Sequence, residues 1–236
     1  MTLTLCRKAL LIPMLVLTSS WACALTPYQA DYQMSWDVGI KLKGTASQRL
    51  SPDEDLWKIE QTANASLGSI EETSWFRQDA TGRIFPLEFV RKTQILGRGK
   101  EQQYRFNWNQ FEVQMDDELS LDIQQGVFDP LTLQLALRQA LSQGTALQIS
   151  LADRGKIKAY PMENLGLQTL DTASGPLSAV QLRYRKNADS HTDMWFDPSR
   201  EHLMVALKAT RDGKTFELQL TGAEFFPKDA TPATPQ

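Results

Sequence analysis

Few side chains in this sequence have the type and spacing that catalysis or metal binding requires. His191 and His202 are the only histidines, and no carboxylates or thiols at the spacing of a metal site accompany them. No serine stands in a nucleophile-elbow pattern. We therefore expect no catalytic residue, no metal ion and no cofactor, and keep a hydrolase as the remote alternative.

Two aspartates that precede prolines are the next candidates for chemistry. Asp197 stands before Pro198 at an expected strand end, where this pair is an ordinary turn former, and a catalytic carboxylate is the alternative interpretation. Asp129 stands before Pro130 at the start of a segment with helical spacing, so a helix cap explains it better than an acid or base.

The first 24 residues predict a cleavable secretory signal. The pair Arg7 and Lys8 is followed by a stretch of nine apolar residues and then by small residues that end at Ala24, which is the order of a signal peptide. A lipid-modified Cys23 is the alternative, but the bulky Trp21 argues against a lipoprotein. The sequence thus predicts cleavage after Ala24 and a periplasmic protein.

The composition after residue 24 excludes several classes of partner. Both cysteines lie in the predicted signal, so the mature chain has no thiol. The full chain has a formal charge of −3. Removal of the predicted signal, which contains two basic and no acidic residues, leaves the mature chain with −5. Mild acidity without a basic block argues against nucleic acid and disfavours simple electrostatic docking onto anionic lipid. No second apolar stretch is long enough for a transmembrane segment.

Alternation with a period of two dominates the mature chain. Residues 28–38 and 40–50 alternate between apolar and polar side chains and predict a hairpin that turns near Gly39. Similar alternation recurs to residue 220, with one dry and one wet face per strand, which is typical of antiparallel sheets. We expect a single, mainly β domain over 25–226, followed by a disordered, proline-rich tail over 227–236.

One segment has helical spacing instead. Leu133, Leu137 and Leu141 recur every four residues between Asp129 and Gly144. Asp129 can cap the first amides, and Gly144 can end the helix. A leucine stripe needs a surface to cover, so we expect this helix to pack on or in a strongly curved antiparallel sheet, a half-barrel.

The sequence also resembles a family of bacterial exported proteins known as domain of unknown function 3108. The resemblance covers nearly the whole mature chain and is strongest in the helix segment 128–138 and in 195–198, which reads Trp-Phe-Asp-Pro. Weaker matches are 28–32 with Gly44, 85–87, 91–92, 103–108 and 175–177. The resemblance implies a periplasmic antiparallel half-barrel and no catalytic residue, since the family has no assigned activity.

The large aromatic and leucine side chains leave two interpretations open. They can simply fill a curved sheet, or they can enclose an apolar cavity for an acyl chain or similar ligand, with the helix as a lid. On the second interpretation the ligand-binding residues are Trp36, Phe89, Tyr104, Phe106, Trp108, Leu133, Leu137 and Trp195. The leading hypothesis is a non-enzymatic protein that binds a lipid or other hydrophobic ligand in envelope biogenesis. The alternative is an assembly factor or scaffold that binds an envelope protein.

Overall fold

The computed structural model describes residues 25–37, 41–116, 118–146, 148–172 and 175–227. The predicted signal segment, the turn near Gly39 and all but the first residue of the predicted tail lie outside these residues. The domain boundaries therefore stay predictions.

The described residues form fifteen strands, one α-helix and one short 3-10 helix. The strands of the first half are β1 (Tyr28–Asp37), β2 (Lys41–Asp53), β3 (Leu56–Ala65), β4 (Gly68–Gln78), β5 (Ile84–Ile95), β6 (Arg98–Asn107), β7 (Glu112–Met115) and β8 (Leu119–Asp122). After β9 (Val127–Phe128) and α1 (Pro130–Gln143), the remaining elements are β10 (Gln148–Asp153), β11 (Lys156–Thr172), β12 (Gly175–Asn187), β13 (Ser190–Asp197), η1 (Pro198–Arg200), β14 (Leu203–Arg211) and β15 (Lys214–Phe225).

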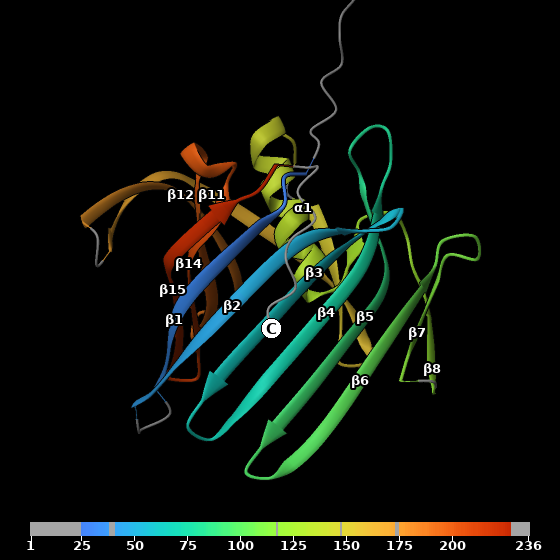
Figure 1. The fold of residues 1–236 in the computed structure, drawn as a ribbon, viewed down its shortest axis with the longest axis horizontal. Helices are drawn as coiled ribbons and strands as arrows, with labels where there is room; N and C mark the ends of the chain where they lie inside the picture. Colours follow the sequence, from blue (N-terminus) through green and yellow to red (C-terminus); the bar gives the residue numbers. More distant parts are fainter. Residues whose placement is uncertain (1–24, 38–40, 117, 147, 173–174, 228–236) are drawn as a thin grey trace, which may run out of the picture.

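All fifteen strands belong to one open sheet with the order β8-β7-β6-β5-β4-β3-β2-β1-β15-β14-β13-β12-β11-β10-β9. Every pair is antiparallel except β9 with β10. The two edge strands, β8 and β9, follow each other in the chain, and the segment between Asp122 and Val127 can span at most roughly 18 Å. The sheet must therefore curl until its edges approach each other, which confirms the predicted half-barrel (Figure 1).

The predicted first hairpin is confirmed by the pairing of β1 with β2, in which Tyr28 lies opposite Leu50 and Trp36 opposite Leu42. One predicted alternation is wrong. The spacing of Phe85, Leu87 and Phe89 in the sequence predicts that the three side chains share one side of their strand, but the register between β4 and β5 shifts there and leaves Leu87 without an opposite residue. This bulge turns Phe85 away from the face on which Phe89 is buried.

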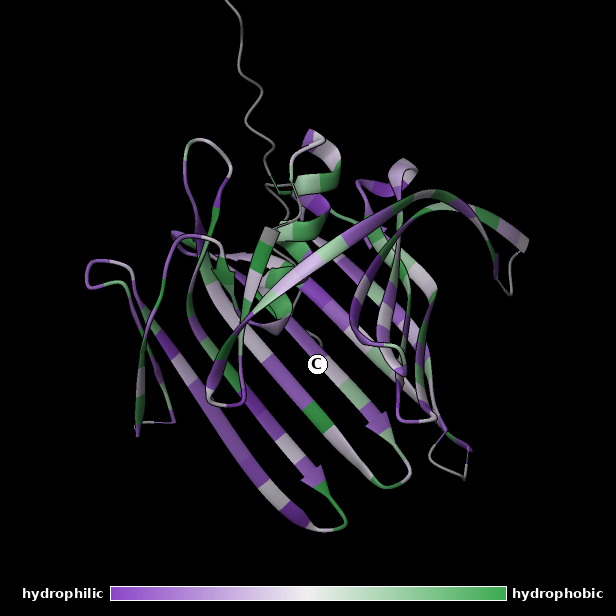
Figure 2. Cartoon of the chain, turned by 180° about the vertical axis from the view of Figure 1, so that it is seen from behind, coloured by the Kyte–Doolittle hydropathy of each residue, from purple (hydrophilic) through white to green (hydrophobic). Residues whose placement is uncertain are grey.

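The helix begins and ends where the sequence predicts. The Asp129 side chain accepts hydrogen bonds from the amides of Leu131 and Thr132, and the Thr132 side chain returns a capping-box contact. Gly144 ends the helix in the left-handed region at φ 63°. The helix lies inside the curl of the sheet (Figure 1), and the hydropathy colouring shows that apolar residues recur along it (Figure 2). Its buried residues include Leu131, Leu133, Leu135 and Leu137.

Candidate functional site

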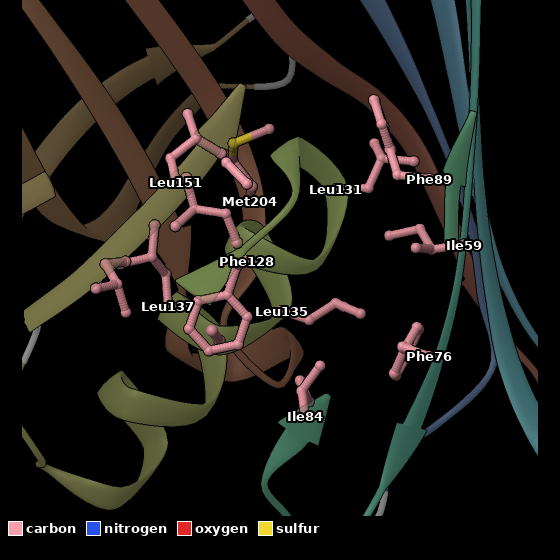
Figure 3. Packing of buried hydrophobic residues seen from close by; sticks show 14 of the residues in the cluster. Ile59, Phe76, Ile84, Phe89, Phe128, Leu131, Leu135, Leu137, Leu151 and Met204 are labelled. Atoms are coloured by element: carbon pink, nitrogen blue, oxygen red, sulfur yellow. The ribbon is translucent and has the colours of Figure 1, made fainter. Parts of the chain in front are cut away.

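The concave side of the sheet, which carries α1, has three zones with different chemistry. The first zone lies under the helix and is fully packed. Leu131 and Leu135 of α1 face Ile59, Phe76 and Phe89 of the sheet, and Leu137 points to the other wall, where Leu151 and Met204 lie (Figure 3). None of the first five side chains is more than 1% exposed, and Leu137 is 0% exposed. This zone is the hydrophobic core of the half-barrel.

The second zone is a row of polar side chains on β2, β3, β4, β5 and β10, which we call the polar belt. It consists of Gln48, Gln61, Glu72, Arg91 and Asp153. Gln48 Nε2 donates to Gln61 Oε1 at 2.9 Å, and Gln61 Nε2 donates to Glu72 Oε2 at 3.3 Å. Arg91 then donates from Nε to Glu72 at 2.6 Å and from Nη1 to Asp153 at 2.9 Å.

The polar belt is also connected to the core and across the half-barrel. Tyr28 donates its hydroxyl to Gln48 Oε1 at 2.6 Å, and Gln48 donates to Gln134 of α1 at 3.0 Å. The bond from Arg91 to Asp153 joins β5 to β10, which are far apart in the order of the sheet. Polar contacts thus hold the two walls together where the sheet itself does not close.

Burial governs the electrostatics of the polar belt. The Glu72 side chain is only 9% exposed. This burial raises the pKa of Glu72, and the adjacent Arg91 guanidinium counteracts the rise. Arg91 has two carboxylate partners, and its guanidinium also lies over the ring of Phe89, 5.2 Å from the centroid.

The third zone lies beyond the polar belt and is apolar but partly exposed. Strand pairing aligns one apolar side chain from each of β1, β15, β14, β12 and β11, and Thr192 of β13 lies between those of β14 and β12. We call the five apolar side chains the outer row: Trp36, Phe216, Ala209, Tyr184 and Met162. Trp36 is 46% exposed, and the other four are half-buried. Tyr184 stacks on Tyr160 at a centroid distance of 3.9 Å. Apolar side chains thus remain accessible on the concave side.

Most of the predicted ligand-binding residues lie in the core or beside it. Phe89, Tyr104, Phe106, Leu133 and Leu137 are buried, with exposures between 0% and 7%. Trp108, which is half-buried, donates from its indole to the Pro86 carbonyl at 2.6 Å and stacks on Phe106. The structure brings these six residues together around α1, β5 and β6, where they pack in or against the hydrophobic core.

The two remaining predicted residues lie elsewhere. Trp36 is at the far end of β1 from the helix and belongs to the outer row. Trp195 alternates with the buried Met194 and Phe196 of β13, so its side chain points to the opposite, convex side of the sheet. The eight residues therefore do not line one common site.

Two of the side chains considered for chemistry, Asp197 and His191, lie beside structural partners. Asp197 caps η1 by accepting from the amide of Ser199 at 2.9 Å, the turn role expected of it. His191 lies 3.8 Å from Asp193, whereas burial and the nearby Arg138 lower the pKa of His202. Among the described residues, no group of three or more histidine, aspartate or glutamate side chains is placed to hold a metal ion.

Two hollows open on the convex side of the sheet. One, of about 360 Å³, lies over β15, β1, β2 and β3, and is lined by polar side chains such as Asp31, Thr45 and Asn64. The other, of about 450 Å³, lies over β6, β7 and β8, and its lining includes Arg105, Glu112 and Gln114. Both are open and polar, so neither resembles an apolar ligand pocket.

The family model for "Protein of unknown function (DUF3108)" matches residues 31–221. The chain belongs to this family. DUF3108 thereby accounts for nearly the whole sheet and for the helix, but its description assigns no activity. None of the curated proteins matches the sequence.

Two solved structures are similar in fold. A β-barrel-like protein of the DUF1849 family from Brucella abortus has a TM-score of 0.60 at 13% identity, over 86% of this chain and 99% of that one. A putative lipoprotein from Parabacteroides distasonis has a TM-score of 0.34 at 9% identity, over 85% of this chain and 96% of that one. The Brucella protein supports the β-barrel-like architecture of this DUF3108 chain.

Sequence reasoning missed the polar belt, although the alternation contains a signal for it. Gln48, Glu72 and Arg91 stand at inward positions of their strands, where apolar neighbours two residues away set the pattern. A polar side chain in such a position needs a partner when it is buried. Which residues supply the partners depends on the sheet order, which a period of two does not encode.

Proposed function

We propose that this DUF3108 protein binds a hydrophobic or amphipathic small molecule, such as an acyl chain, on the concave side of its half-barrel. One observation carries the proposal: the outer row of apolar side chains lies in register across the strands and stays partly exposed. Exposed apolar area costs free energy, about 25 cal/mol per Å², which a bound apolar ligand recovers.

The polar belt gives the proposed ligand an orientation. Arg91 and Gln61 are half-buried members of the belt on the same concave side as the outer row. A polar end group can form hydrogen bonds with the belt while an apolar chain lies along the outer row, which is how a few polar groups orient a ligand in an apolar site.

The proposal places this activity in the periplasm and gives the protein no enzymatic role. The support for export is the signal pattern of the first 24 residues. Among the described residues, no helix has the length and apolar character needed to cross a membrane.

Binding of a fluorescent fatty acid to the delipidated protein tests the proposal. We expect binding at micromolar concentration and a loss of about tenfold or more in Trp36→Ser and Met162→Ser, since each removes apolar contact area. Trp195→Ser is the matched control, because Trp195 lies on the convex side. Native mass spectrometry of the protein from its own periplasm should show an added mass that solvent extracts. Absence of both probe binding and added mass would refute the proposal.

A protein partner is the second candidate function, and one feature of the sheet favours it. β6 pairs with β5 from Arg98 to Arg105, but β7 pairs with it only from Tyr104 onward. The outer edge from Arg98 to Gln102 thus has no neighbouring strand among the described residues and can accept an added strand. Pull-down from solubilised envelopes should then return a stoichiometric partner, and its repeated absence would argue against this function.

A further inference from the structure

Five hairpin turns lie together at the end of the half-barrel that is remote from α1 and from the ends of the described chain. They join β1 to β2, β3 to β4, β5 to β6, β12 to β13 and β14 to β15 (Figure 1). Strand register brings them together: Asp37 pairs with Thr215, Gly44 with Ala65, and Gly68 with Ile95. We call the described residues of these turns, with three strand residues on either side of each, the hairpin rim.

The hairpin rim carries most of the exposed large apolar side chains. Eight such side chains occur among the described residues, and five of them are in the rim: Trp36, Leu67, Ile70, Ile95 and Leu96. Leu96 is the most exposed, at 74%. The Leu96 amide donates to the Leu67 carbonyl at 3.0 Å, so the tips of two hairpins present their leucines next to each other. The hydropathy colouring marks apolar residues at these tips (Figure 2).

Basic side chains surround these apolar residues. The hairpin rim contains eight lysines and arginines, all exposed, against three aspartates: Lys41, Lys43, Arg98, Lys100, Arg185, Lys186, Arg211 and Lys214, against Asp37, Asp189 and Asp212. The hairpin turns at the other end, which join β2 to β3, β4 to β5, β6 to β7, β11 to β12 and β13 to β14, contain five basic and eight acidic residues when the described residues are counted in the same way. The rim is therefore cationic although the chain as a whole has a formal charge of −3.

We propose that the hairpin rim docks on the surface of a membrane that contains anionic phospholipid. Lipid phosphates complement the eight basic side chains, and each lysine or arginine near such a surface strengthens binding about fivefold. Leu67 and Leu96, at the ends of two joined turns, enter the interface between headgroups and acyl chains, where apolar side chains gain burial. Trp36 at the neighbouring turn suits the same interface, since its indole has an apolar body and a polar N–H.

A membrane surface fits this pattern better than a protein partner. The five apolar side chains are distributed over three neighbouring turns, which join β1 to β2, β3 to β4 and β5 to β6, and exposed basic residues flank the first and the third of these turns. The core of a protein interface is depleted of charged residues, particularly lysine, whereas a peripheral membrane surface combines apolar and basic residues. This proposal does not depend on a ligand at the outer row, and the two can fail separately.

Flotation with lipid vesicles tests the proposal. The purified protein should bind vesicles that contain phosphatidylglycerol, bind vesicles of phosphatidylcholine alone much more weakly, and detach at high salt. Leu96→Asp should weaken binding about tenfold or more. Leu96 has φ 49°, a left-handed conformation that aspartate tolerates, so the variant should keep its fold.

Phe111→Asp is the matched control. Phe111 is 48% exposed with φ 53°, but it lies at the other end of the half-barrel, so its replacement should leave vesicle binding unchanged. Equal effects of the two substitutions, or no effect of Leu96→Asp, would overturn the proposal.

The charge requirement is tested with a second pair of variants. Arg98→Gln with Lys100→Gln should weaken binding roughly 20-fold and reduce its salt dependence. Lys58→Gln with Arg77→Gln removes two charges at the other end and should change neither. If the wild-type protein bound both kinds of vesicle equally, or if salt did not affect binding, the electrostatic role would be contradicted. If the folded wild-type protein bound neither kind of vesicle, the whole proposal would be overturned.

Discussion

The Ser74 hydroxyl donates a 2.7 Å hydrogen bond to Oδ2 of Asp129, in the buried interior between β4 and the start of α1. The other oxygen of the same carboxylate, Oδ1, accepts from the amides of Leu131 and Thr132 at 2.8 and 3.0 Å. One side chain thus caps the helix and fastens it to the sheet. This double role explains why an aspartate at this position needs no catalytic interpretation.

The first prediction concerns this junction. Asp129→Ala should lower the free energy of unfolding by about 2–4 kcal/mol, because it removes the cap and leaves the buried Ser74 hydroxyl without its acceptor. Ser74→Ala removes one hydrogen bond and should cost about 1–2 kcal/mol. Urea denaturation measures both. Equal stability of wild type and Asp129→Ala would show that the helix is not held at this point.

The second prediction separates a core helix from a mobile lid. Leu137 is 0% exposed and Leu133 is 7% exposed. Each replacement by alanine should therefore cost about 2–5 kcal/mol, as cavities in a packed core do. Leu141→Ala, at a half-buried position of the same helix, should cost less. If α1 were a lid instead, the Leu133 and Leu137 variants would alter ligand release more than the denaturation midpoint.

The third prediction concerns the ion pairs of the polar belt. Arg91→Met should cost about 3–5 kcal/mol, because it leaves the buried Glu72 without its cation. Replacing both partners, as in Arg91→Met with Glu72→Met, removes the unpaired charge and should restore part of this loss. A double-mutant cycle from denaturation curves measures the coupling. Additive losses would mean that the two side chains do not stabilise each other.

The fourth prediction is a pH dependence. Burial alone would raise the pKa of Asp193, but two hydrogen bonds from Arg183, at 2.6 and 2.9 Å, bring the pKa below its ordinary value. The folded state then binds this proton less readily than the unfolded state, so the pair stabilises the fold above about pH 4 and loses its contribution as the pH falls further.

Asp193→Asn isolates this contribution. The difference in unfolding free energy between wild type and the variant should be greatest near neutral pH, at about 1–3 kcal/mol, and should shrink on acidification. Thermal unfolding in a series of buffers measures it. A difference that stays constant from neutral to acidic pH would contradict the role of the Asp193 carboxylate.

The sequence was sufficient for the class of fold and for the helix, because local patterns encode both. Alternation marks the strands, and Asp129 and Gly144 mark the ends of α1. The polar belt and the hairpin rim were not predicted, because both combine residues from strands far apart in the sequence. Net acidity argued against anionic lipid, yet Arg98 of β6 and Arg211 of β14 belong to one cationic end of the half-barrel that only the strand register reveals.

The fifth prediction follows from a close approach of two strands. A Cβ atom added to Gly44 of β2 would lie 2.2 Å from the Asn64 carbonyl oxygen of β3 and 2.8 Å from Cε of Met34. Gly44→Ala must therefore displace backbone in the curved sheet and should cost about 1–3 kcal/mol. Gly222→Ala on β15 is the control, because its added Cβ would meet nothing within 4 Å, and its stability should stay near that of wild type. Equal stability of both variants in urea denaturation would show that the sheet can widen at Gly44 without cost.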